Sequence, residues 1–194
     1  MKKHKKYRKP RSKNNITPIV IGLGLMLIGI VLFVALQGAS KSSASSTADR
    51  SVVPMSVNYP VPSLSLQNIN GEIEALEDFR EKVLLVNNWA TWCPPCKAEM
   101  PSIEKYYEAH TADGFVVVAI EAGQGMDEVT KFANDFNLKF HVWLDPNGGS
   151  LNAFKNGNLP NSYVIDRTGT VRYAWTGEIS LAMLEKFVTP LIAE

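Results

Sequence analysis

Residues 83–100 read VLLVNNWATWCPPCKAEM, and this stretch decides the fold. Its first four residues form a continuous apolar run, which is typical of a central strand covered on both faces of a sheet. The pair Cys93 and Cys96 follows, and the residues from Lys97 to His110 are expected to form a helix. A strand and a helix joined through this pair place Cys93 at the N-terminus of the helix.

The chain has 194 residues and only these two cysteines. A single domain of roughly 100–150 residues can bury a core without disulfide cross-links. Two cysteines therefore do not describe a disulfide framework. Their Cys-x-x-Cys spacing indicates redox or metal chemistry instead.

The position of the pair favours thiol–disulfide exchange. Free amides and the helix dipole at a helix N-terminus stabilise a thiolate, and Cys96 lies one turn further on, where it can resolve a mixed disulfide. Pro94 and Pro95 have no amide hydrogen, so only Cys96 and later residues can donate to the Cys93 sulfur. We therefore predict a moderately stabilised thiolate, which favours a reductant over a strong oxidant.

Three other interpretations of the cysteine pair are disfavoured. Structural zinc needs about four ligands, and His110 and His141 have no finger-like spacing to the pair. A purely structural disulfide across so short a loop would be strained and easily reduced. Peroxidase chemistry of the peroxiredoxin type would need Pro-x-x-x-Thr-x-x-Cys, but Val86 and Ala90 occupy those places before Cys93.

The remaining pattern predicts an α/β fold with a central mixed sheet and helices on both faces. An N-terminal hairpin is expected from strands at 63–66 and 72–74 around a turn at 68–71, followed by a helical turn at 76–80. Further strands are expected at 115–120, 140–144, 162–165 and 171–175, with helices at 127–136 and 181–192.

An apolar segment precedes this domain. Residues 16–36, ITPIVIGLGLMLIGIVLFVAL, carry no charge and are long enough to cross a bilayer as a helix. Residues 1–15 hold 8 of the 20 basic residues, and the positive-inside rule keeps such a tail in the cytoplasm. We predict a basic cytoplasmic tail at 1–15, a signal-anchor helix at 16–36, a flexible Ser/Ala-rich linker at 37–60 and an extracytoplasmic domain at 61–194. A cleaved signal peptide is the alternative.

The charge balance supports this division. Beyond the tail the chain has 12 basic against 19 acidic residues, a balance of −7, so the domain gives no indication of nucleic-acid binding. The tail is explained by topology and by contact with anionic lipids. The expected location is therefore a bacterial cell membrane, with the domain tethered outside the cytoplasm.

Two stretches, VNNWATWCPPCKAEMP at 86–101 and LPNSYVIDRTG at 159–169, resemble the TlpA/ResA family of membrane-tethered bacterial thiol–disulfide reductases. The resemblance covers the chain from about Val61 to its end and implies a thioredoxin-like fold. It implies that Cys93 is the attacking thiol and Cys96 the resolving one. It also implies that Pro160 is cis, faces the disulfide and exposes the Leu159 backbone for pairing with an extended client strand.

The same resemblance implies a role for Glu99, which matches an acidic residue of reductases in cytochrome c maturation. A partly buried carboxyl there would have a raised pKa and move protons to or from the thiols, whereas the alternative is a solvated acid in the first helical turn. We expect Trp92, Pro94 and Pro95 to contact clients, with plain packing as the alternative for Trp92.

Two residues depart from the family pattern. Asn88 stands where an aromatic residue is usual, and Asn161 follows the cis-proline where Thr is common. We expect both to bear on partner choice more than on chemistry.

These observations predict a monomeric reductase of disulfides in exported proteins, such as apocytochrome c before haem attachment. A membrane thiol carrier would supply electrons. The redox group would be the Cys93–Cys96 disulfide, with no metal. The chain has no GxGxxG and no P-loop motif, so no nucleotide or flavin cofactor is expected. The alternatives are a disulfide oxidase or isomerase, a copper(I)-binding assembly chaperone, and an interaction protein in which the Cys pair is incidental.

Overall fold

The computed structural model describes residues 51–194. The predicted tail, the apolar segment and residues 37–50 of the predicted linker lie outside the described residues. Within 51–194, no helix is both long enough and apolar enough to span a bilayer.

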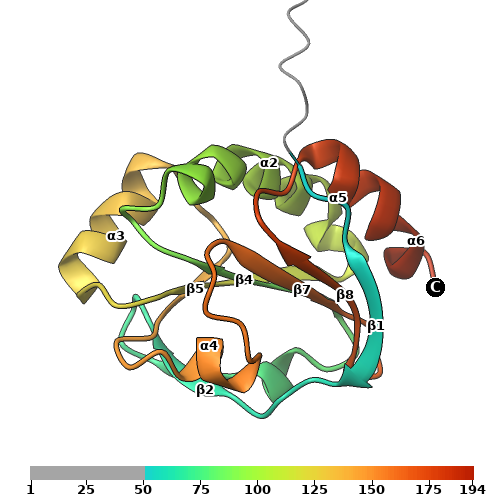
Figure 1. Ribbon diagram of the computed structural model, residues 1–194, viewed down its shortest axis with the longest axis horizontal. Helices are drawn as coiled ribbons and strands as arrows, with labels where there is room; N and C mark the ends of the chain where they lie inside the picture. Colours follow the sequence, from blue (N-terminus) through green and yellow to red (C-terminus); the bar gives the residue numbers. More distant parts are fainter. Residues whose placement is uncertain (1–50) are drawn as a thin grey trace, which may run out of the picture. The chain divides into compact units, whose positions relative to one another are not determined.

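An eight-stranded mixed sheet forms the centre of the domain, in the order β1-β8-β7-β4-β5-β6-β2-β3 (Figure 1). The strands are β1 (Met55–Pro60), β2 (Ser65–Asn68), β3 (Ile73–Ala75), β4 (Val83–Trp89), β5 (Phe115–Glu121), β6 (His141–Leu144), β7 (Asn161–Ile165) and β8 (Thr170–Thr176). The helices are α2 (Pro94–His110), α3 (Met126–Asp135), α4 (Gly149–Ala153), α5 (Leu181–Phe187) and α6 (Thr189–Ile192), with 3-10 turns η1 (Leu76–Phe79) and η2 (Thr111–Asp113). Strands β4, β5 and β6 run parallel, and the other pairs are antiparallel.

The predicted mixed sheet with helices on both faces is confirmed. Strand β4 is buried along its whole length, and its side chains alternate between two hydrophobic clusters. Leu85 and Trp89 belong to the cluster that also contains residues of α2, α3, α5 and α6, whereas Leu84 and Val86 belong to the cluster beside η1 and α4. Figure 1 shows α2 and α5 on one side of the sheet and α4 on the other.

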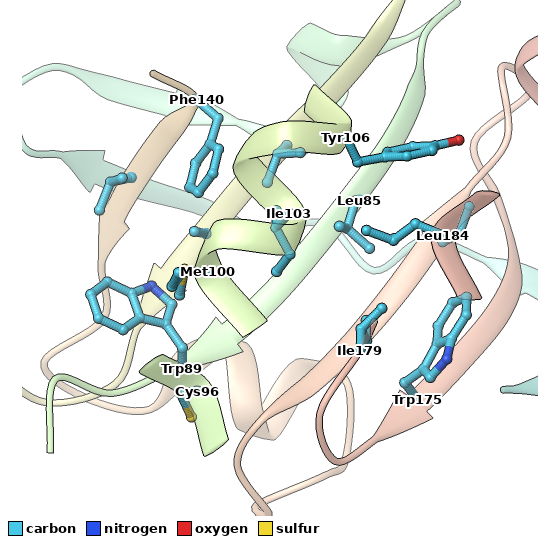
Figure 2. Packing of buried hydrophobic residues seen from close by; sticks show 14 of the residues in the cluster. Leu85, Trp89, Cys96, Met100, Ile103, Tyr106, Phe140, Trp175, Ile179 and Leu184 are labelled. Carbon is cyan, nitrogen blue, oxygen red and sulfur yellow. The ribbon is translucent and has the colours of Figure 1, made fainter. Parts of the chain in front are cut away.

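The larger cluster fixes α2 against the sheet. Met100, Ile103 and Tyr106 follow one face of α2 at helical spacing and are at most 1% exposed. They belong to the same cluster as Leu85 and Leu184 of α5, and Figure 2 shows Met100 near Trp89. The helix that begins at the cysteine pair is therefore held along much of its length by core packing.

The prediction of a flexible linker through residue 60 is wrong for residues 55–60. These residues form β1, which pairs antiparallel with β8 from Met55↔Ala174 to Pro60↔Thr170. Five of its six side chains are exposed, because an edge strand can be held mainly by main-chain hydrogen bonds on one side. A strand of this kind has no clear hydrophobic alternation, and the ordered domain therefore begins before residue 61.

Two helical segments also differ from the prediction. The single helix expected at 181–192 is divided into α5 and α6, since Pro190 lacks an amide hydrogen and its ring disfavours a continuous helix. The short helix α4 was not predicted. It begins where the Asp145 carboxylate accepts hydrogen bonds from the amides of Gly149 and Ser150, both at 2.8 Å.

Truncating the buried centre of β4 should unfold the domain more readily. We expect Leu85→Ala to lower the free energy of unfolding by about 2–5 kcal/mol, because Leu85 is fully buried and the substitution leaves a cavity. Urea denaturation followed by tryptophan fluorescence measures the change. Ile73→Ala, at a side chain that is 70% exposed, is the control and should stay within about 0.5 kcal/mol. Equal losses in the two variants would contradict the assignment of β4 as the core strand.

Candidate active site

The cysteine pair lies between the end of β4 and the start of α2. Cys93 is the N-cap residue of α2, and a disulfide joins it to Cys96 with the two Cα atoms 5.3 Å apart. The Cys96 amide donates to the Cys93 sulfur at 3.3 Å. An N-cap side chain can accept from the second or third helical residue, and here the second is Pro95, which has no amide hydrogen. The prediction that Cys96 is the first available donor is confirmed.

The two sulfurs differ in their access to the surface. Cys96 is fully buried, whereas Cys93 retains 3% exposure at the boundary of the core. Trp92, just before Cys93, is 63% exposed, and Pro94 just after it is exposed as well. A side chain this exposed contributes little to the core. Exposed apolar side chains therefore flank Cys93, and of the two cysteines Cys93 is the one that retains some exposure.

The peptide bond between Leu159 and Pro160 is cis, as predicted. It immediately precedes β7, whose first residue, Asn161, pairs with Asn88 near the end of β4. The cis-proline loop and the cysteine pair therefore lie at the same end of the two adjacent central strands β7 and β4. Leu159 is half-buried against the cluster that contains both cysteines, and the Pro160 carbonyl accepts a hydrogen bond from the Gly177 amide at 2.8 Å.

Glu99 is fully buried in α2, three residues beyond Cys96. Its Oε1 accepts from Asn87 Nδ2 at 2.8 Å, and its Oε2 accepts from the Ile179 amide at 3.0 Å. Burial raises the pKa of this carboxyl to about 8, against the lowering effect of the two hydrogen bonds, and the nearby charge of Glu178 adds to the rise. The alternative of a solvated acid is excluded, and the site contains a carboxyl that titrates close to the ordinary range of a thiol.

Two partners of Glu99 were missed in the sequence. Asn87 bonds both Glu99 and the Ser162 hydroxyl, the latter also at 2.8 Å. The signal was available, because two asparagines interrupt an otherwise apolar central strand and buried amides need partners. The Ile179 amide has no such signal, since it reaches Glu99 from 80 residues further along the chain.

The histidines considered as metal ligands lie elsewhere. His110 is in the last turn of α2, at the opposite end from Cys96, and its ring lies beside Tyr106. His141 begins β6 and contacts the carboxylate of Glu74. Between residues 51 and 194 the structure brings together no group of three or more His, Cys, Asp or Glu side chains that could hold a metal ion.

Known proteins are similar to this chain in sequence. Residues 57–174 match the AhpC/TSA family. The chain is 33% identical over 132 residues to the thiol-disulfide oxidoreductase ResA of Geobacillus kaustophilus, covering 68% of this chain and 76% of that protein. It is 31% identical over 160 residues to the thioredoxin-like protein YneN of Bacillus subtilis, covering 80% and 92%.

A solved structure extends the likeness to three dimensions. The thioredoxin-family thiol:disulfide interchange protein of Chlorobium tepidum superposes with a TM-score of 0.64 at 25% identity, covering 71% of this chain and 99% of that one. The predicted thioredoxin-like fold is therefore confirmed. The chain belongs to the AhpC/TSA family of thioredoxin-like proteins, as a thiol-disulfide oxidoreductase of the ResA type.

Proposed function

We propose that this oxidoreductase works as a reductase of disulfides in exported proteins, with apocytochrome c before haem attachment as the favoured client. One observation carries the direction of electron flow. The helix offers the Cys93 sulfur the Cys96 amide at 3.3 Å, while Pro94 and Pro95 offer none. A thiolate with little stabilisation leaves the dithiol form less favoured, and a dithiol of this kind gives up its electrons readily.

The reaction follows from the different access of the two sulfurs. The Cys93 thiolate attacks one sulfur of the client disulfide, and the other client sulfur leaves as a thiolate. The Cys96 thiolate then attacks the Cys93 sulfur, forms the intramolecular disulfide and releases the second client sulfur. Two electrons pass to the client, and the disulfide seen here is the product state of this enzyme.

Glu99 supplies the proton transfer that the second step needs. Cys96 is fully buried, so its thiol must lose a proton inside the protein before it attacks. A carboxyl one helical turn away, with a pKa of about 8, matches the ordinary thiol range closely enough to accept that proton. In the reverse direction, when the disulfide is reduced again, the protonated carboxyl returns it.

The exposed surface around Cys93 would bind the client. Trp92 and Pro94 offer exposed apolar surface, Pro95 is half-buried beside them, and the Leu159 backbone would pair with an extended client strand. No metal or further cofactor takes part in this scheme. The protein would act as a monomer held at a bacterial cell membrane by residues 16–36, and a membrane thiol carrier would reduce it again.

The reduction potential tests the direction of electron flow. We expect the Cys93–Cys96 couple to have a potential near or below about −270 mV, in the range of thioredoxin. Equilibrating the full-length protein in detergent against a thiol redox buffer, then quantifying free thiols, measures it. Pro95→Ala is an informative variant because it restores a second amide donor to the Cys93 sulfur, and it should move the potential in the oxidising direction. A wild-type value near −120 mV, typical of a strong oxidant, would show that the protein oxidises its clients instead.

The role of Glu99 predicts a specific pH profile. Below pH 8 the carboxyl is mostly protonated and cannot accept a proton, so client reduction should accelerate as the pH rises through about 8. Glu99→Gln cannot accept a proton at any pH and should lose this rise, with a rate about 100-fold lower at pH 8–9. Stopped-flow measurement of client reduction from pH 6 to 10 provides the profile.

Glu104→Gln is the matched control for this experiment. Glu104 is another acid of α2 with a pKa raised by burial, but it bonds the Lys139 amide, away from the cysteines. This variant should keep the wild-type pH profile. The proton-transfer role is refuted when both variants lose the rise in rate with pH, or when Glu99→Gln keeps that rise.

A further inference from the structure

Asn88 of β4 and Asn161 of β7 form a buried polar chain that ends at the cis-proline loop. We propose that the two asparagines are positioning residues for client binding: they fix the loop at 156–160 and thereby favour polypeptide disulfides over small ones. The inference rests on the proposed pairing of clients with the Leu159 backbone.

The hydrogen bonds of the two asparagine side chains form a continuous series from α4 to the loop. Asn161 Nδ2 donates to the Asn158 carbonyl at 2.6 Å and to the Asn156 carbonyl at 3.4 Å. Asn161 Oδ1 accepts from Asn88 Nδ2 at 2.8 Å, and Asn88 Oδ1 accepts from the Ser150 hydroxyl. Asn88, Asn161 and Ser150 are all at most 1% exposed. Every polar group of the two asparagine side chains therefore has a partner inside the protein.

Only one orientation of the two amides satisfies this chain. The carbonyls of Asn156 and Asn158 can only accept, so the nitrogen of Asn161 must face the loop. Its oxygen then faces Asn88, which must donate, and the oxygen of Asn88 is left for the Ser150 hydroxyl. Replacing either asparagine leaves a buried group without a partner, and the cost falls on the geometry of the loop.

The loop depends on this buried anchor. Main-chain hydrogen bonds hold its two ends, at the Asn156 amide and the Pro160 carbonyl. Between them, the side-chain hydrogen bonds from the Asn158 amide to Asn156 Oδ1 and from Asn156 Nδ2 to the Thr176 hydroxyl are exposed to water. The Asn158 carbonyl held by Asn161 directly precedes Leu159, the residue proposed to pair with the client. A loop fixed before binding loses less conformational entropy when an extended client docks on it.

The hydrogen-bonded series Ser150–Asn88–Asn161 is separate from the proton-transfer residues. Successive side chains of a strand point to opposite faces, so Asn87 bonds Glu99 on the α2 side while Asn88 bonds Ser150 of α4 on the other. Disturbing Asn88 should therefore change client binding without changing the redox couple. This separation gives the experiment its specificity.

The test compares a peptide disulfide with a small disulfide. The full-length reduced protein is assayed with an extended peptide carrying a Cys-x-x-Cys disulfide and with 5,5′-dithiobis(2-nitrobenzoate), which has no backbone to pair. Asn161→Asp keeps the shape of the side chain but removes the donor to the loop, and Asn88→Leu removes the link behind it. We expect the KM for the peptide to rise about tenfold in each variant. The kcat for the peptide and the rate on the small disulfide should stay within about twofold of wild type, and the reduction potential should be unchanged.

Two further variants control for stability. Tyr106→Phe removes a hydrogen bond between Tyr106 of α2 and Thr189 of α6, away from the loop. This variant should leave the peptide KM unchanged. Ser150→Ala removes only the far end of the chain and should raise the peptide KM by a smaller factor, so it serves where the asparagine variants fold poorly.

The outcomes separate the two proposals. A wild-type protein without preference for the peptide refutes the client-binding role of Leu159, and the positioning role with it. A wild-type preference that survives in Asn161→Asp, Asn88→Leu and Ser150→Ala refutes the positioning role alone. An equal fall with both substrates would also overturn it, because that result indicates a general loss of structure.

Discussion

The antiparallel pairing of β4 with β7 is the constraint on which the site depends. It aligns Leu84 with Ile165 at one end and Asn88 with Asn161 at the other. Because the two strands run in opposite directions, the end of β4 that leads into the cysteine pair lies beside the start of β7, where the cis-proline is. Two stretches some 70 residues apart in the chain therefore meet at the same end of two central strands. A shift of the pairing register by one residue would turn the asparagines to the opposite face of the sheet.

The asparagines of β4 show how this strand serves two faces at once. A buried central strand is expected to be apolar, and a buried amide is costly unless it is fully bonded. On the α4 side Asn88 meets that requirement through Ser150 and Asn161. On the α2 side the Asn87 nitrogen donates to Glu99 and Ser162, whereas the buried Asn87 side-chain oxygen has no hydrogen-bond partner among the described residues. Polar residues that interrupt an otherwise apolar central strand in this way are typical of functional positions.

The sequence was sufficient wherever the physical signal is local. Continuous apolar runs located β4 and β5, and the Cys-x-x-Cys pair between a strand and a helix located the disulfide and the first amide donor to the Cys93 sulfur. Edge strand β1 was missed because its side chains are mostly exposed, so only its main-chain bonds to β8 define it. The burial of Glu99 was left open because it results from the packing of residues such as Ile179, which local spacing cannot place.

The stabilisation of the Cys93 sulfur is determined by its neighbours in sequence, because Pro94 and Pro95, the first two residues of α2, have no amide hydrogen to donate. The raised pKa of Glu99 depends instead on contacts from β4 and from the segment before α5, which exist only in the complete fold. A loosened domain would keep a reactive thiol but lose the buried proton acceptor for Cys96. Coupling between exchange and proton transfer is thus a property of the packed domain, whereas the tendency toward reduction belongs to the cysteine motif itself.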